Sequence, residues 1–171
     1  GFPKDRYYLY KSRWMPDTPM VHILPHWNFP DKIGETIPVF VYSSGDVVEL
    51  FLNGKSLGKK EKRPYEYRFR WDSVKYEPGE LKAIAYKQNR KWAETYVRTT
   101  GKAVGLKAVP DKHRIKADGE DLVFVTVSLV DEEGCDVPTA ENVISCSLIG
   151  DGEIVATDNG DPTCLITFSE P

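Results

Sequence analysis

The stretch LFLNGKSLG at residues 50–58 decides the fold of the first part of this chain. Two short apolar segments flank Asn53-Gly54, which is the strongest short-range signal for a two-residue β-hairpin turn. Asn and Gly tolerate the positive φ angles that a type I′ turn requires at both central positions. The stretch therefore predicts two antiparallel strands joined by a tight turn.

The residues around this hairpin repeat the pattern of an all-β domain. In ELKAIAYK, residues 80–87, the side chains alternate as they do in a strand with one buried face. Turn signals rich in Gly, Pro and Asn separate such segments. The expected strands are 36–43, 47–52, 55–60, 65–71, 80–87 and 91–99. This spacing predicts an immunoglobulin-like or fibronectin-like β-sandwich over residues 31–100.

The first thirty residues differ in pattern from the rest of the chain. Residues 3–14 are predicted to form one helix, and Pro3 suits its first position. Aromatic side chains recur there at helical spacing and form one stripe: Tyr7, Tyr10 and Trp14. Four prolines within residues 15–35 argue against a helix or a central strand, so we expect an ordered linker. Residues 1–30 are therefore expected to be a helix and a Pro-rich connector.

A second β unit is predicted over residues 101–171. Its most apolar segment, LVFVTVSLV at 122–130, is expected to be a central strand. The expected strands are 103–109, 113–116, 122–130, 143–149 and 152–157. A complete immunoglobulin-like sandwich has about seven strands, so this one is expected to be incomplete. An incomplete sheet has an open edge, which is a template for pairing with another chain.

Composition places limits on the function. A net charge of −3 over 171 residues gives no electrostatic reason to expect binding to nucleic acid or to an anionic membrane. No apolar run is long enough to span a bilayer, so membrane insertion is not expected. The chain opens inside an expected helix and closes at an expected strand, which is typical of a piece of a longer protein.

The three cysteines give little information. Cys135, Cys146 and Cys164 lack the spacing of a metal site. Cys146 and Cys164 alternate in phase with apolar neighbours and are expected to be small core residues. A disulfide between Cys146 and Cys164 is an alternative in an oxidising compartment, but two free thiols are the favoured interpretation.

Several stretches resemble one known family. They are VELFLNGKSLG at 48–58, GFPKDRYYLYKSRW at 1–14, PMVHILPHWNFP at 19–30, IKADGEDLVFVTVSLVDEEG at 115–134 and GEIVATDNGDPT at 152–163. The hairpin stretch resembles the β-sandwich domains that follow the catalytic barrel in glycoside hydrolase family 2, in its β-galactosidase subgroup from gut bacteria. The two N-terminal stretches resemble the last helix of that (β/α)₈ barrel and the connector leaving it. The two C-terminal stretches resemble the family's final domain, and the first of them also resembles invasin-type bacterial immunoglobulin-like domains.

The resemblance implies a fragment without the catalytic residues. A retaining glycosidase uses two carboxylates about 5 Å apart, and in this family both are glutamates at the C-terminal ends of barrel strands. On this resemblance, the chain contains one helix of the barrel and none of its strands. No catalytic residue can therefore be assigned in this chain, and no cofactor is implied. The implied partner is the catalytic barrel of the parent chain. The implied location is the bacterial periplasm, the cell surface or the secreted fraction.

Trp27 and Asn28 are the first candidate binding residues. On this resemblance, the connector lies near the barrel, so an aromatic side chain there would reach the active-site mouth and stack on a sugar. The alternative, which is favoured, is that Trp27 fills the space between domains, since aromatic residues dominate cores and interfaces. Trp92 is a further candidate because it follows a turn signal and is expected to be partly exposed.

Aromatic residues of the first sandwich offer a second kind of carbohydrate site. The set is Tyr65, Tyr67, Trp71, Tyr86, Trp92 and Tyr96. Carbohydrate-binding modules stack such rings on sugar faces. These residues alternate as a core face should, however, so packing in the core is the favoured interpretation.

Metal binding has weak support. His22 and His26 have the spacing of a helical metal site, but Pro25 lies between them and breaks a helix. Asp158 and Asp161 lie in an oxygen-rich loop and are weak candidates for calcium ligands. Because Asp and Asn are also common turn residues, no metal site is expected.

Three functions remain open. The first is a scaffold within a family 2 enzyme that cleaves terminal β-galactosides with retention of configuration. The second is a carbohydrate-binding module that tethers the parent to polysaccharide. The third, suggested by the invasin-like stretch, is a cell-surface adhesion module. Self-association is expected through the open edge of residues 101–171 or through the stripe Tyr7, Tyr10 and Trp14.

Overall fold

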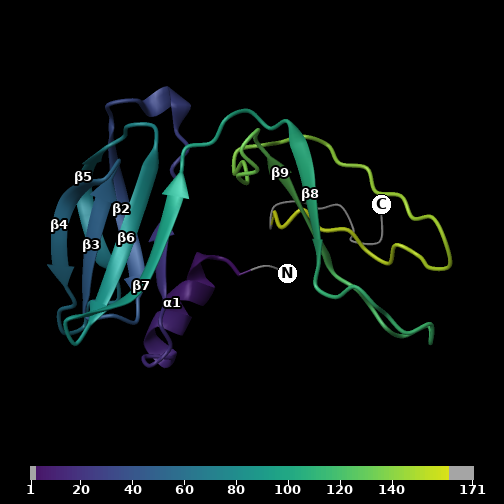
Figure 1. The fold of residues 1–171 in the computed structure, drawn as a ribbon, viewed down its shortest axis with the longest axis horizontal. Helices are drawn as coiled ribbons and strands as arrows, with labels where there is room; N and C mark the ends of the chain where they lie inside the picture. Colours follow the sequence, from purple (N-terminus) through teal and green to yellow (C-terminus); the bar gives the residue numbers. More distant parts are fainter. Residues whose placement is uncertain (1–2, 162–171) are drawn as a thin grey trace.

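The computed structural model describes residues 3–161. Figure 1 shows a pair of facing sheets with helix α1 (Asp5–Trp14) beside them, and a more open part with strands β8 (Gly105–Pro110) and β9 (Val125–Val130). Nine β-strands and one α-helix form within the described residues. The predicted all-β class is therefore confirmed.

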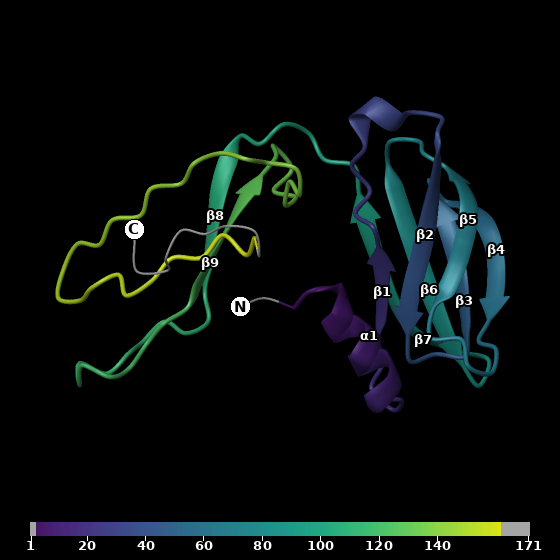
Figure 2. The same ribbon diagram turned by 180° about the vertical axis from the view of Figure 1, so that it is seen from behind.

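The first part is a sandwich of two antiparallel sheets, seen from both sides in Figures 1 and 2. Sheet A consists of β1 (Val21–Leu24), β2 (Thr36–Ser43) and β5 (Phe69–Lys75), with β2 in the centre. Sheet B consists of β3 (Val47–Leu52), β4 (Lys55–Glu61), β6 (Glu80–Lys87) and β7 (Arg90–Arg98), in the order β4-β3-β6-β7.

The hairpin between β3 and β4 forms as predicted. Asn53 has φ 48° and Gly54 has φ 80°, which are the positive angles of a type I′ turn. The Asn53 side chain also joins the hairpin to the neighbouring strand, because its carbonyl oxygen accepts the backbone N–H of Glu80 at 2.8 Å. The turn is thus tied into sheet B rather than left free.

The core lies between the two sheets and is built from alternate residues of the strands. The side chains with no exposed surface in β2, β3 and β6 are Val39, Val41, Val48, Leu50, Leu81, Ala83 and Ala85. Burial of a large aliphatic side chain contributes about 1.5–3 kcal/mol. The alternation predicted for residues 80–87 is confirmed, since Lys82 and Ile84 are only partly buried.

The strand predicted at residues 65–71 is displaced toward the C-terminus. Residues 63–66 form a turn in which the Glu66 N–H donates to the Arg63 carbonyl oxygen at 3.1 Å, and Tyr65 has φ 67°. Pro64 within this turn has no N–H for a sheet. Strand β5 therefore begins only at Phe69.

The N-terminal segment differs from the expected helix and linker. Helix α1 starts at Asp5 with Lys4 as its N-cap residue, so Pro3 precedes the helix instead of opening it. The predicted linker contains an edge strand, β1, which pairs with β2, and a short 3-10 helix at Pro30–Lys32. A proline-flanked segment is tolerated there because an edge strand has one unpaired side.

The second part forms fewer strands than predicted. Strands β8 and β9 pair antiparallel, and the predicted strands at 113–116, 143–149 and 152–157 are not formed. For residues 113–116, part of the reason is local hydrogen bonding, since the Asp121 carboxylate accepts the Lys116 N–H at 2.9 Å and the Asp118 carboxylate accepts the Asp121 N–H at 2.9 Å. Such side-chain bonds compete with strand pairing.

The joint between the two parts is held by Asp131 at the end of β9. Its carboxylate accepts the backbone N–H groups of Gly101 at 3.0 Å, Glu133 at 3.0 Å and Cys135 at 2.9 Å. These bonds, that from Gly101 foremost, hold the pKa of Asp131 below its usual value. Among residues 3–161, no helix is long and apolar enough to cross a membrane.

Candidate functional site

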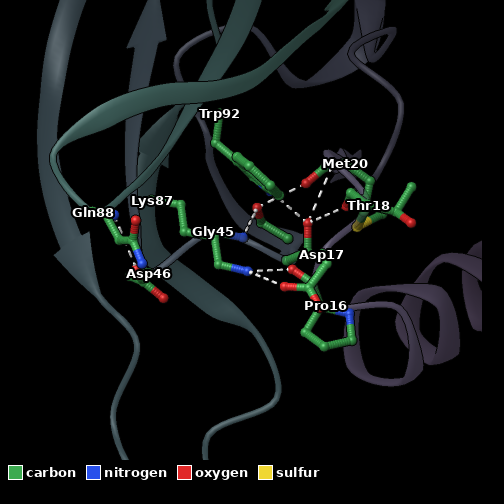
Figure 3. Close-up of polar contacts among 11 residues, drawn as sticks. Pro16, Asp17, Thr18, Met20, Gly45, Asp46, Lys87, Gln88 and Trp92 are labelled. Atoms are coloured by element: carbon green, nitrogen blue, oxygen red, sulfur yellow. Dashed lines mark hydrogen bonds and ion pairs between the residues drawn. The ribbon is translucent and has the colours of Figure 1, made fainter.

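Buried polar groups join the N-terminal connector to the sandwich (Figure 3). The Ser44 hydroxyl donates to the Thr18 carbonyl oxygen at 2.6 Å. It accepts the backbone N–H of Met20 at 3.2 Å and the indole N–H of Trp92 at 2.8 Å. A hydroxyl has one donor and two acceptor sites, so the full capacity of Ser44 is used. We call this set the connector junction: Thr18, Met20, Ser43, Ser44, Gly45 and Trp92.

Ser43 and Gly45 complete the junction. The Ser43 hydroxyl donates to the Met20 carbonyl oxygen at 2.8 Å and accepts the Gly45 N–H at 2.9 Å. A Cβ atom at Gly45 would lie 2.8 Å from the Tyr86 carbonyl oxygen. The sequence Ser-Ser-Gly at the β2–β3 turn is therefore required by close approach of β6 and by bonding to the connector.

Two lysines cover the junction. The Lys62 ammonium donates to the Ser43 carbonyl oxygen at 2.9 Å, and burial lowers the pKa of Lys62. The Lys87 ammonium donates to the Pro16 carbonyl oxygen, pairs with Asp17 at 3.3 Å and lies 4.8 Å from the centre of the Trp92 ring (Figure 3). Lys87 therefore binds the connector, and Lys62 binds the turn.

The connector is fastened a second time at Trp27 and Asn28. The Trp27 side chain has no exposed surface, and its indole N–H donates to the Glu77 carbonyl oxygen at 3.0 Å. The Thr99 hydroxyl donates to the Trp27 carbonyl oxygen at 2.8 Å, and the Asn28 amide donates to the Thr100 hydroxyl at 2.8 Å. The bond to Glu77 ties the connector to the segment between β5 and β6, and the bonds to Thr99 and Thr100 tie it to the segment that leaves β7.

The predicted ligand-binding residues therefore lie in structural positions. Trp27 and Asn28 lie together, and Trp27 offers no face to a sugar because it is fully buried. Asn28 is 6% exposed and its amide is bonded within the chain. Trp92 is partly exposed, as expected, but its indole N–H is bonded to Ser44. The stacking role of Trp27 has no geometric basis here.

The aromatic set of the first sandwich is divided between core and surface. Trp71 is 6% exposed and lies in the core, as predicted. Core packing is wrong for Tyr65, Tyr67 and Tyr96, which are 100%, 48% and 56% exposed. Tyr65 and Tyr67 precede β5, and Tyr96 lies on the outer face of sheet B, so strand alternation does not turn them inward.

Helix α1 has one bound side and one exposed side. On the bound side, the Asp5 carboxylate contacts His22 Nε2 of β1 at 2.8 Å, and the Tyr8 ring stacks on the His22 ring at 3.8 Å. On the exposed side lies the predicted stripe: Tyr7, Tyr10 and Trp14, which are 48%, 45% and 75% exposed. The Tyr10 and Trp14 rings stack on each other at 4.7 Å.

The weak metal candidates are turn residues in the structure. The Asp158 carboxylate accepts the Gly160 N–H at 2.8 Å, and the Asn159 side chain accepts the Asp161 N–H at 2.9 Å. Within residues 3–161, no group of three or more His, Cys, Asp and Glu side chains is arranged to hold a metal ion. The His22 ring bonds to Asp5 instead, and loss of water on burial lowers the pKa of His26.

The cysteine predictions are tested in part. Cys135 is partly buried and Cys146 is exposed, and both are free thiols. Cys146 is therefore not the core residue predicted from its alternation. Cys164 lies outside the described residues, as does any bridge that includes it.

The polar contacts described above attach the connector to the sandwich. In the described part of the chain, every buried side-chain nitrogen or oxygen has a hydrogen-bond partner. Sequence reasoning treated Ser44-Gly45 as a turn signal and missed the role of the Ser44 hydroxyl, because its partners lie 24, 26 and 48 positions away. No local pattern of a single sequence marks such contacts.

Two family models match the chain. Residues 34–93 match a domain of unknown function, DUF4982, and residues 106–171 match glycoside hydrolase family 2 C-terminal domain 5. The first range lies in the sandwich and the second begins in β8. The fold and these matches identify the chain as a C-terminal region of glycoside hydrolase family 2.

Relatives and solved structures agree with this assignment. A β-galactosidase from Bacteroides ovatus is 42% identical over 171 residues, which cover 99% of this chain and 20% of the relative. A putative β-glucuronidase from Formosa agariphila is 38% identical, over 95% of this chain and 16% of the relative. A β-glycosidase structure from Bacteroides vulgatus has TM-score 0.77 and 36% identity, over 82% of this chain and 18% of that one. The chain spans about a fifth of the length of these proteins.

Proposed function

We propose that this chain is a non-catalytic accessory region that holds the catalytic domain of a retaining glycoside hydrolase. The observation that carries the proposal is the two-sided helix α1. Its Asp5 and Tyr8 side is bound to β1, whereas its aromatic stripe is exposed. An exposed apolar face of this kind is typical of an interaction surface.

The fastening of the connector supports the same function. The connector junction and the Trp27–Asn28 contacts hold the connector to the sandwich at two places. A helix attached in this way has a fixed direction relative to the sheets. A partner bound to the stripe would therefore be held in one orientation, which is what a scaffold requires.

The reaction of the parent is part of the proposal. We assign to it the hydrolysis of terminal β-galactosides by a retaining, two-carboxylate mechanism. The relative from Bacteroides ovatus is named a β-galactosidase, which supports this substrate. The Formosa agariphila relative is named a putative β-glucuronidase, so β-glucuronides are the competing substrate class. A periplasmic, secreted or cell-surface location belongs to the same proposal.

An assay of the chain alone tests the non-catalytic part. We expect the purified 171-residue chain to release no chromophore from nitrophenyl β-galactoside or β-glucuronide above the rate in buffer. The Bacteroides ovatus β-galactosidase serves as the positive control, and a heat-denatured sample of the chain as the negative one. Turnover that copurifies with the chain through a second column would contradict the proposal.

A further inference from the structure

The outer face of sheet B carries a shallow groove of about 290 Å³. Phe51, Gly54, Glu80, Lys82 and Ile84 line it. This volume lies just below the range for drug-sized ligand sites, roughly 300–1,000 Å³. The groove lies on the side of sheet B that faces away from the core, because the alternate residues Leu50, Leu52, Leu81, Ala83 and Ala85 point inward.

Strand register places an aromatic ring beside this groove. Phe51 of β3 is opposite Lys82 of β6, and Lys82 is opposite Tyr96 of β7. Residues directly opposite in antiparallel strands project from the same face. Tyr96 is 56% exposed, while Phe51 and Ile84 are half-buried. The groove thus has an apolar floor next to an exposed ring.

The exposed ring is supported by a neighbouring cation. The Arg98 guanidinium lies 4.7 Å from the centre of the Tyr96 ring, within the distance of a cation–π contact. Arg98 is held in turn by Glu80, which lines the groove and accepts from Arg98 Nη2 at 2.8 Å. The Tyr96 ring is therefore linked to the groove through Arg98 and Glu80.

The charged groups at the groove are paired with one another. Glu80 pairs with Arg98 at 2.8 Å, and Glu94 pairs with both Lys82 and Lys91 at 2.9 Å. Each of these three cations already has a carboxylate partner, so none is left free for a charged ligand. The remaining hydrogen-bonding positions of these charged groups still offer both donors and acceptors to a neutral one.

One rim of the groove is open to a ligand. Gly54 lies at the hairpin tip, and no atom lies within 4 Å of the position that a Cβ would occupy there. A flat molecule can therefore approach the backbone at this end. The other lining residues belong to β3 and β6, which are the two central strands of sheet B, so the floor is rigid.

We propose that this groove binds a short neutral oligosaccharide, with one sugar ring against Tyr96 and a neighbouring one against Phe51. A sugar ring has an apolar C–H face, which suits an aromatic surface, and a rim of hydroxyls that both donate and accept. The groove supplies the apolar floor, and Glu80, Lys82, Glu94 and Arg98 supply partners for the rim. A uronate or a phosphate is negatively charged, and the cations at the groove already pair with carboxylates of the protein.

The site is independent of the proposed scaffold role. It uses the outer face of sheet B, whereas the scaffold role uses α1 and the connector. The choice of galactose-containing probes rests on the proposed function, but the class of neutral sugars does not. Failure of sugar binding would leave the outcome of the hydrolysis assay untouched, so the two proposals fail separately.

The test is a titration of the 171-residue chain with β-1,4-galactotriose, cellotriose and a glucuronic-acid-containing trisaccharide, followed by amide chemical shifts. We expect saturable shifts in β3, β6 and β7 with at least one neutral trisaccharide, and none with the acidic one. Tyr96→Ala is expected to weaken that binding by about tenfold, which corresponds to about 1.4 kcal/mol.

Tyr65→Ala is the matched control, because Tyr65 is fully exposed in the turn between β4 and β5 and does not line the groove. It is expected to leave binding unchanged. Unchanged shifts outside sheet B would show that both variants remain folded. The proposal is overturned if no neutral trisaccharide binds, if Tyr96→Ala binds as well as the original chain, or if the acidic sugar alone binds.

Discussion

Replacement of Trp27 by Ala is expected to lower the free energy of unfolding by about 3–5 kcal/mol, the usual cost of removing a buried large aromatic side chain. Trp27 has no exposed surface and meets the Tyr76 ring at an angle of 62°, with 5.0 Å between ring centres. Its indole N–H also bonds to the Glu77 carbonyl oxygen at 3.0 Å. Urea unfolding followed by circular dichroism measures the change.

The control for this variant is Trp14→Ala. Trp14 is 75% exposed on α1, so its removal is expected to change the free energy of unfolding by no more than about 0.5 kcal/mol. The comparison holds the residue type constant and changes burial. Equal effects of the two substitutions would show that Trp27 does not act as a core residue.

Replacement of Ser44 by Ala is expected to cost about 2–4 kcal/mol, because each buried group left unsatisfied costs about 1–3 kcal/mol. The substitution leaves the Met20 N–H, the Trp92 indole N–H and the Thr18 carbonyl oxygen without their common partner. The loss is expected in the same urea titration. It should also release the connector locally, seen as faster exchange of the Met20 amide.

Ser56→Ala is the matched control for this second variant. Ser56 is exposed, and its hydroxyl donates to the Glu49 carboxylate at 2.7 Å and accepts the Gly58 N–H at 3.2 Å. Water replaces these partners at the surface, so the expected change is about 0.5 kcal/mol or less. A Ser44→Ala effect no larger than that of Ser56→Ala would mean that the connector junction does not stabilise the fold.

Much of the sandwich could be predicted because its signals are local. The Asn53-Gly54 turn depends on two residues that tolerate positive φ. The strands β2, β3 and β6 have the predicted bounds, because their alternation is regular and turn residues flank them. The stripe of α1 likewise follows from helical spacing, and its three aromatic side chains lie together on the exposed side of the helix.

The rest depends on contacts that local patterns do not contain. The edge strand β1 is not predicted because the prolines that flank it argue against a strand. An edge strand pairs along one side only, here with β2, so flanking prolines do not prevent it. The core prediction fails for Tyr65 and Tyr67 because the turn at Pro64 interrupts the strand that alternation suggests. The role of the Ser44 hydroxyl is hidden because its partners are distant in sequence.

The second part shows a further limit of alternation. Residues 143–149 alternate as a strand should, but a strand also needs a neighbour to supply its ladder bonds. Within the described residues, pairing of extended strands in this part is confined to β8 and β9. Alternation identifies segments suited to a sheet and does not establish that the partner segment is present.

The central claim is that connector and sandwich form one cooperative unit, and amide hydrogen exchange of the 171-residue chain tests it most directly. The Met20 N–H donates to the buried Ser44 hydroxyl, and Leu50 lies in the centre of sheet B. His22 of β1 is opposite Tyr42 of β2, in a position where its N–H points toward β2. We predict that the amides of Met20, His22 and Leu50 exchange with similar free energies of opening, as residues of one unit do. Free exchange at Met20 and His22 while Leu50 stays protected would show an independent connector and contradict the scaffold account.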